Sequence, residues 1–267
     1  MRPLVDPDLL DVGLSAARRR NRRPSYRGVT FQPLNGWMLK TLYVGLAQGL
    51  PTILPLGDLY GEHERPHQPG FGRWLASLGA IYSLDRMVAL DLPWWNIAAT
   101  EAVEEFLRAR PSATVFEYGS GASSLWLARR AKSVITVEHD ADWAAKVGAK
   151  LGGHANARLI SVPGLPGGQA PGHSQATDHP YVRAIASQGL FNLIVIDGRQ
   201  RTRCLEAALP HLKPGGIILF DDSGRKRYRK SIETCGLVER HFFGRSYCVP
   251  YSDHTSILSH PSDTGKV

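Results

Sequence analysis

Acidic residues stand at or near the ends of four short apolar runs of the sequence, as Glu117, Glu138, Asp197 and the pair Asp221 and Asp222. Runs of this length, rich in Val, Ile and Phe, are typical of strands that are buried on both faces of a parallel sheet. The carboxyl ends of parallel strands meet at one edge of the sheet, where open α/β sheets bind their ligands. A carboxylate at this edge can hold the hydroxyls of a ribose or accept a proton from a reacting group.

A glycine turn follows the first of these runs. The run Thr114–Tyr118 leads into Gly119-Ser120-Gly121, where the missing β-carbons let the backbone turn tightly and approach a ligand. Ser123 or Ser124 can cap the helix that follows. Glu138 comes roughly 20 residues after the turn, which is where a nucleotide-binding βαβ unit places the acid that binds ribose hydroxyls.

The turn lacks the third glycine of dinucleotide-binding sites, because position 124 is a serine. That third glycine lets the helix pack closely on the strand. S-adenosylmethionine (SAM) has no phosphate, and a looser Gly-x-Gly turn can hold its methionine end. An NAD-dependent oxidoreductase or a noncatalytic nucleotide-binding protein with this fold remains an alternative, although the sequence has no Tyr-x-x-x-Lys pair to support the oxidoreductase.

Three motifs resemble those of the class I SAM-dependent methyltransferases and occur in the right order and spacing. Glu117–Gly121 is similar to the first motif, Val137–Asp140 to the second and Leu212–Asp222 to the strand-five region. The resemblance covers residues 93–258. It implies a Rossmann-like α/β three-layer sandwich, with a mostly parallel seven-stranded sheet, an antiparallel last strand and an N-terminal helical extension.

The resemblance also implies roles for individual residues. Glu117 is expected to support the methionine end of the cofactor, Glu138 to hold the ribose hydroxyls and His139 to flank the adenine. Asp197 would lie where the transferred methyl group meets the acceptor, so we expect it to be the catalytic residue, as a base or as an orienting group. The rest of the expected cofactor-binding set lies in the turn and the helix start: Gly119, Ser120, Gly121 and Ser123.

The expected acceptor is a small molecule that is methylated on a hydroxyl group. Trp94 and Trp95 stand just ahead of the cofactor unit and are candidates for the wall of the acceptor site, although paired tryptophans are usually core residues. Asp221, Asp222 and Arg201 are the other substrate candidates. The Asn/Asp-Pro-Pro-Tyr signature of enzymes that methylate exocyclic base nitrogens is absent after Asp197, which lowers the case for a DNA adenine enzyme.

The aspartates at these strand ends partly resemble the carboxylates of the catechol-type, magnesium-dependent O-methyltransferases. In those enzymes a divalent ion binds between the two strand ends and lowers the pKa of the acceptor hydroxyl, and oxygen ligands of this kind suit Mg²⁺. The third ligand there is typically an amide, where this chain has Asp222. Arg199 and Arg201 can instead pair with the aspartates, which makes a metal unnecessary, or receive an anionic acceptor. No residue is therefore assigned as a metal ligand.

The formal net charge is +8 and the sequence pI is about 9.6, a balance that suits nucleic acid, anionic membranes or acidic partners. Much of this charge is local, since residues 18–23 contain five arginines. We expect a solvated tail there; an RNA methyltransferase that uses this basic arm is the alternative. Three cysteines without metal-like spacing and the lack of a signal-peptide pattern lead us to expect a cytoplasmic protein.

The chain is expected to have four parts. Residues 1–35 form an irregular basic segment, residues 36–92 a helical extension, residues 93–260 the SAM-binding domain and residues 261–267 a disordered tail. The apolar stretch 36–56 is interrupted by charged, glycine and proline residues, so we do not expect it to span a membrane.

Within the domain, Pro93 suits the start of a helix that ends near Arg108. A mobile loop rich in glycine and proline is expected over residues 163–179. Two strands, Val238–Phe243 and Thr255–Leu258, should form a closing antiparallel pair.

Overall fold

The computed structural model describes residues 71–163 and 179–263. The basic segment predicted over residues 1–35 lies outside the described residues, as do most of the predicted helical extension, nearly all of the predicted loop at 163–179 and the last four residues. Within the described part, no helix combines the length and the apolar character that a membrane span requires.

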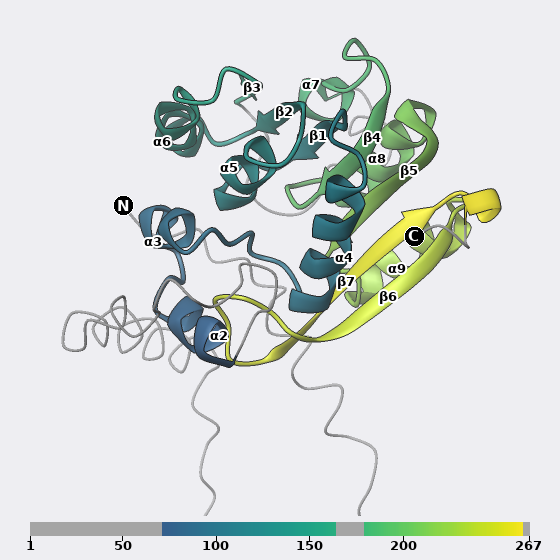
Figure 1. The fold of residues 1–267 in the computed structure, drawn as a ribbon. Coiled ribbons are helices and arrows are strands. Elements are labelled where there is room, and N and C mark those ends of the chain that lie inside the picture. The colour runs from purple at the N-terminus through teal and green to yellow at the C-terminus, as the bar shows by residue number, and fades with distance from the viewer. Residues whose placement is uncertain (1–70, 164–178, 264–267) are drawn as a thin grey trace, which may run out of the picture.

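The centre of the molecule is a seven-stranded sheet with the order β3-β2-β1-β4-β5-β7-β6 (Figure 1). Neighbours from β3 through β5 are parallel, whereas β7 runs antiparallel to both β5 and β6. The predicted sheet and its antiparallel closure are thus confirmed. The strands are β1 (Thr114–Tyr118), β2 (Ser133–Glu138), β3 (Ala157–Ser161), β4 (Phe191–Ile196), β5 (Leu212–Asp221), β6 (Val238–Arg245) and β7 (Ser252–Ser259).

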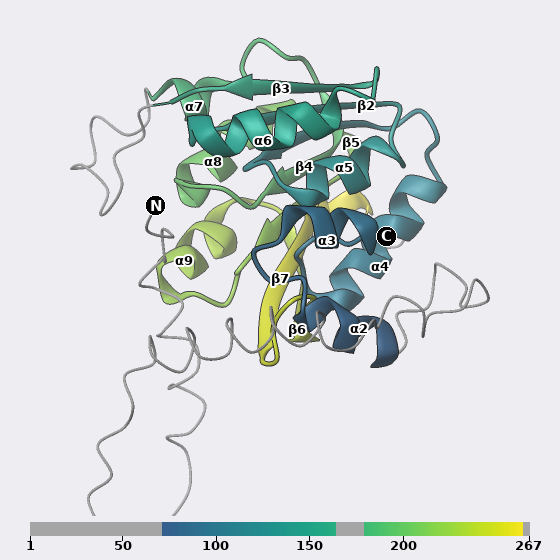
Figure 2. The ribbon, with the colours of Figure 1, turned by 90° about the vertical axis from the view of Figure 1, so that its left-hand side faces the viewer.

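Helices cover both faces of the sheet and complete the predicted three-layer sandwich (Figures 1 and 2). One face carries α4 (Ile97–Arg108), α5 (Ala122–Ala128) and α6 (Ala141–Leu151), with α2 (Phe71–Leu78) and α3 (Leu84–Ala89) beside them. The opposite face carries α7 (Pro180–Arg183), α8 (Arg201–Ala208) and α9 (Lys226–Thr234). Short 3₁₀ helices span Leu209–His211 and Pro261–Asp263.

The side chains of successive strand residues pack alternately into two hydrophobic cores, one on each face of the sheet. Val115 and Leu193 point into the core beneath α4, α5 and α6, while their neighbours Phe116 and Ile194 point into the core beneath α7, α8 and α9. This is the two-residue alternation of strands that are buried on both faces. Burial on both faces leaves the carboxyl edge of the sheet as the part where polar side chains gather.

The helix that was predicted to begin at Pro93 begins instead at Ile97. Asn96 is its N-cap, and the side-chain oxygen of Asn96 accepts hydrogen bonds from the backbone N–H groups of Ala98 (3.0 Å) and Ala99 (3.3 Å). Asparagine satisfies these first N–H groups, which a proline side chain cannot do. The residues before the cap are therefore free to run along the sheet edge toward the strand ends.

The strand order changes direction between β1 and β4. From β1 the chain first builds outward through β2 and β3, then crosses back to place β4 on the other side of β1. At such a switch point the loops that follow the two central strands lead away from each other, which leaves room for a ligand at the carboxyl edge. The acidic residues that were singled out in the sequence lie at this edge.

Candidate functional site

The loops after β1 and β4 cross in direct contact. Gly119 has a φ of +93°, and a β-carbon built on it would lie 2.6 Å from the α-carbon of Gly198. A β-carbon on Gly198 would in turn lie 1.9 Å from the hydroxyl of Tyr181. The N–H of Asp197 also donates to the carbonyl of Tyr118 at 3.0 Å. Asp197 is therefore held at a fixed place beside the glycine turn.

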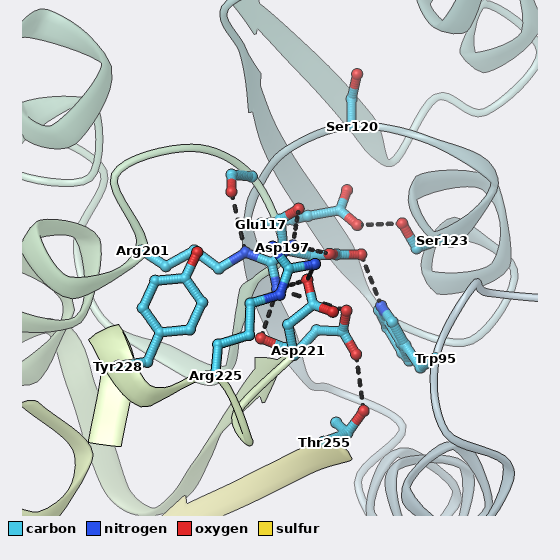
Figure 3. Close-up of polar contacts among 12 residues, drawn as sticks. Trp95, Glu117, Ser120, Ser123, Asp197, Arg201, Asp221, Arg225, Tyr228 and Thr255 are labelled. Atoms are coloured by element: carbon cyan, nitrogen blue, oxygen red, sulfur yellow. Dashed lines mark hydrogen bonds and ion pairs between the residues drawn. The ribbon is translucent and has the colours of Figure 1, made fainter. Parts of the chain in front are cut away.

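Glu117 is fully buried beneath the start of α5 rather than facing the edge of the sheet (Figure 3). Its two oxygens accept hydrogen bonds from the hydroxyls of Ser123 and Ser124, each at 2.5 Å. Burial raises its pKa to about 7, although the serine bonds oppose this shift. These contacts hold the turn and the helix together, and a role of Glu117 and Ser123 in binding the cofactor stays a prediction.

The N-cap of α5 is Gly121, not one of the two serines. Ser124 nevertheless contributes to the cap, since its hydroxyl oxygen accepts the N–H of Gly121 at 3.0 Å. A β-carbon on Gly121 would meet only the hydroxyl of Ser123, at 3.8 Å. The backbone of the turn is accessible at this glycine, which fits the close approach of a cofactor.

Glu138 ends β2 and is 3% exposed. One oxygen accepts the N–H (2.9 Å) and the hydroxyl (3.0 Å) of Ser120; the other accepts the N–H groups of His139 (2.8 Å) and Asp140 (3.0 Å). Burial alone would raise its pKa, but the contacts with His139 and with these backbone amides outweigh burial and hold the pKa below its usual value. A carboxylate with a lowered pKa suits ribose hydroxyls, and the hydroxyl of Ser120 is a donor that can rotate away for them.

Neighbouring aromatic rings surround this part of the turn. The indole N–H of Trp143 on α6 donates to the carbonyl of Ser120 at 2.7 Å. The ring of His139 meets the ring of Tyr181 edge to face, with 5.8 Å between the centroids. The role of His139 beside the adenine stays a prediction, and nothing in the sequence pointed to the contacts of Trp143 or Tyr181.

Asp197 closes β4 and keeps 22% of its side-chain surface exposed. One carboxylate oxygen accepts the indole N–H of Trp95 at 3.1 Å, and the other lies 2.9 Å from the guanidinium of Arg201. Burial and the charge of Asp221 raise its pKa well above the usual value, which Arg201 and Trp95 partly oppose. Trp95 is 1% exposed, so it positions Asp197 rather than forming the wall of an acceptor site.

The other predicted substrate residues are also engaged within the protein. Asp221 is the last residue of β5 and Asp222 follows it, and both side chains are 10% exposed. Arg201 is buried between them and Asp197, where it forms ion pairs with all three, and Arg225 pairs with Asp222 at 2.8 Å. Burial and Asp222 raise the pKa of Asp221 to about 7. Arg201 therefore serves these carboxylates instead of receiving an anionic acceptor.

A magnesium site does not fit these carboxylates as they stand. Mg²⁺ needs oxygen ligands at about 2.0–2.1 Å in an octahedral arrangement and keeps several waters. Here the guanidinium of Arg201 fills the space on which the three carboxylates converge. In the described part of the chain, no group of three or more His, Cys, Asp or Glu residues is arranged to hold a metal.

Two residues of β7 join the site without a signal in the sequence. The hydroxyl of Thr255 donates to Asp221 at 2.7 Å, because the antiparallel register places these residues opposite each other. Asp253 lies two residues earlier, and burial and Asp222 raise its pKa to about 6. The sequence predicted both strands but not their register, so neither contact could be anticipated.

Residues 116–223 match the model of a methyltransferase-domain family. No curated protein sequence matches this chain. Similar solved structures include a methyltransferase-like protein from Silicibacter pomeroyi, with 23% identity over 64% of this chain and 91% of that one and a TM-score of 0.43. N-methyltransferase NodS from Bradyrhizobium japonicum, in complex with S-adenosyl-L-homocysteine, has 16% identity over 67% and 97% of the two chains and a TM-score of 0.41. An rRNA methylase from Streptococcus thermophilus has 15% identity over 60% and 95%, with a TM-score of 0.44.

The matched segment runs from β1 through the end of β5 and so contains the glycine turn, Glu138 and Asp197. It lies on a sheet with the switch point between β1 and β4 and an antiparallel β7, which is the arrangement that the sequence motifs led us to expect. Residues 116–223 therefore match a methyltransferase domain, and the sheet that carries them has the topology that the resemblance to class I methyltransferases led us to expect.

Proposed function

We propose that this enzyme binds SAM against the turn Gly119–Gly121 and Glu138, and methylates a hydroxyl group of a small-molecule acceptor. Residues 93–260 would form the catalytic domain. The proposed compartment is the cytoplasm, because three cysteines without metal-like spacing suit a setting that keeps thiols reduced.

The observation that carries this proposal is the position of Asp197. Its carboxylate is partly exposed, lies beside the glycine turn and has a pKa well above the usual value because of burial and nearby carboxylates. A carboxylate with a raised pKa is a stronger base than an exposed aspartate. The proton of an acceptor hydroxyl must be removed during methylation, and a base at this position could accept it.

Each residue of the site has a proposed part in this reaction. When bound, SAM supplies a methyl group that its sulfonium already activates. Glu138 would hold the ribose hydroxyls, Gly119 and Gly121 would let the backbone approach the cofactor, and His139 would flank the adenine. Asp197 would accept the proton of the acceptor hydroxyl, while Trp95 and Arg201 keep its two oxygens in place.

Trp94 remains the proposed contact of the acceptor. It is partly buried, and its ring packs edge to face on Tyr82 with 5.2 Å between the centroids. Tyr82 is 44% exposed and has a φ of +58°, an uncommon backbone conformation for a bulky residue. Such conformations persist where the surrounding structure enforces them, often at binding sites. The two rings would form an apolar wall of the acceptor site, because Trp94 is next in the chain to Trp95, which contacts Asp197.

Methyl transfer to a panel of small hydroxyl compounds tests the proposal. Wild type, Asp197→Asn and the control Asp142→Asn are compared with labelled SAM; Asp142 is exposed on α6 and undergoes the same chemical change. We expect transfer to a hydroxyl acceptor that falls about 10²–10⁴-fold in Asp197→Asn, the usual contribution of a general base, and is unchanged in the control. Full activity of Asp197→Asn, or transfer to RNA alone, would contradict the proposal.

A further inference from the structure

Arg201 lies at the centre of the polar group at the ends of β4 and β5 (Figure 3). Its Nε donates to the carbonyl of Gly198 at 3.0 Å, and Nη2 donates to both the carbonyl (3.1 Å) and the carboxylate (2.9 Å) of Asp197. Nη1 donates to the carbonyl of Asp221 and lies 3.5 Å from its carboxylate and 2.9 Å from that of Asp222. One buried cation thus joins two strand ends.

Each of the three carboxylates is also held by a second partner. Asp197 accepts the indole N–H of Trp95, Asp221 accepts the hydroxyl of Thr255, and Asp222 pairs with Arg225. These partners come from the segment before α4, from β7 and from the start of α9. The carboxylates are therefore fixed around the guanidinium instead of being free to converge on an added ion.

The backbone is also shaped to bring these charges together. Gln200, just before Arg201, has a φ of +53°, and Asp222 has a φ of +56°. Left-handed conformations of residues other than glycine cost about 1–3 kcal/mol and persist only where other contacts enforce them. Gln200 precedes Arg201 and Asp222 is itself one of the paired carboxylates, so the backbone is strained at the place where these charges meet.

We propose that Arg201 is the internal cation of this methyltransferase site, in the place between the strand ends where a related enzyme would bind a divalent metal. Three carboxylates gathered in a buried space repel one another unless a cation is present. A guanidinium stays charged at every physiological pH and can bond several oxygens at once. Arg201 neutralises and positions the three carboxylates, one of which is Asp197. Its guanidinium occupies the space that a divalent ion would need, so the site does not bind divalent ions. The inference rests on the proposed role of Asp197.

Binding of Mn²⁺ alone tests this assignment without an acceptor. Mn²⁺ is titrated into the full-length wild type, Arg201→Ala and the double variant Arg201→Ala/Asp197→Asn, and the free ion is measured by electron paramagnetic resonance. Arg203→Ala is the control, because Arg203 lies on the same helix and pairs with Glu206. We expect no saturable site in wild type and the control, one site in Arg201→Ala, and its loss in the double variant.

Two results would overturn the assignment. The first is a stoichiometric Mn²⁺ site in wild type that Asp197→Asn removes, because the carboxylates would then hold a metal with Arg201 present. The second is a folded Arg201→Ala that binds no Mn²⁺, because the carboxylates would then form no cation site at all. SAM affinity, measured on the same samples, tests the proposed function separately. If the wild type did not bind SAM, the proposed function would fail, but neither Mn²⁺ result would change.

A melting experiment covers the case in which Arg201→Ala is unstable. Removing one partner of buried ion pairs leaves uncompensated charge, which is strongly destabilising. We expect guanidinium ions or Mn²⁺, at low millimolar concentration, to raise the melting temperature or the refolding yield of Arg201→Ala but not of Arg203→Ala. Arg201→Lys, which keeps one positive charge, should recover part of the stability and bind no Mn²⁺. Equal responses of the two alanine variants to the added cations would refute the assignment.

Discussion

Replacing Glu138 by glutamine should weaken SAM binding by about 10- to 150-fold, on the basis of one charge-assisted hydrogen bond worth about 1.5–3 kcal/mol. Glutamine keeps the shape and one carbonyl oxygen, while it removes the charge that we expect the ribose hydroxyls to need. Alanine is a poor substitute here. It would leave the N–H groups of Ser120, His139 and Asp140 without their acceptor, so a binding loss could reflect a disordered turn.

Glutamine itself has a cost that follows from the same contacts. Its amide N–H₂ would face donors where a carboxylate oxygen now accepts two of them, so we expect a loss of stability of about 1–3 kcal/mol. This loss is expected because Glu138 accepts hydrogen bonds from protein donors on both oxygens.

Isothermal titration with SAM measures the affinity, and thermal melting of the same samples measures the stability. Glu105→Gln is the matched control, since Glu105 is exposed on α4 and undergoes the same chemical change. Glu105→Gln should match the wild type in both measurements. Equal SAM affinity of folded Glu138→Gln and wild type would refute the assignment of Glu138 to the ribose.

Three further substitutions follow from the contacts around the turn. Gly198→Ala should destabilise the protein by about 1–3 kcal/mol, because its new methyl group meets the Tyr181 hydroxyl, and adding Tyr181→Phe should restore part of the loss in urea unfolding. Because the pKa of Glu117 is raised to about 7, folding takes up a proton and stability falls as the pH rises from about 4.5 to about 7; Glu117→Gln should flatten this slope in unfolding measurements at several pH values. Ser120→Ala removes a hydroxyl that occupies Glu138, so calorimetry should show SAM affinity equal to or tighter than wild type; a large loss would mean that Ser120 binds the cofactor itself.

The sequence predicted the sheet well because its strands are buried on both faces and read as unbroken apolar runs. The central strand β1 has the bounds of the predicted run Thr114–Tyr118, and the acidic residues at the ends of β1 and β4 lie near each other at the switch point. Helix starts were harder to predict. Pro93 and Asn96 are both plausible first-turn residues, and only the packing of Trp95 against the sheet edge decides between them.

The roles of single side chains depend on contacts between distant segments. Whether Glu117 faces the ligand or α5 depends on the pleat of β1 and on the two serine hydroxyls, and the sequence shows only the acid before the glycines. Whether Arg201 receives a substrate or pairs with aspartates depends on the distance between the ends of β4 and β5. Local sequence patterns carry no information on that distance, so the sequence left both readings open.

Hydrogen–deuterium exchange of the full chain, with and without SAM, most directly tests where this enzyme works. SAM should slow amide exchange in residues 119–124, at the turn, and in residues 138–140, after β2. Exchange in β6, at the far edge of the sheet, should be unchanged. Protection of these two segments by SAM and not by NAD is the predicted result. Equal protection by NAD, or SAM protection confined to other segments, would contradict the site described above.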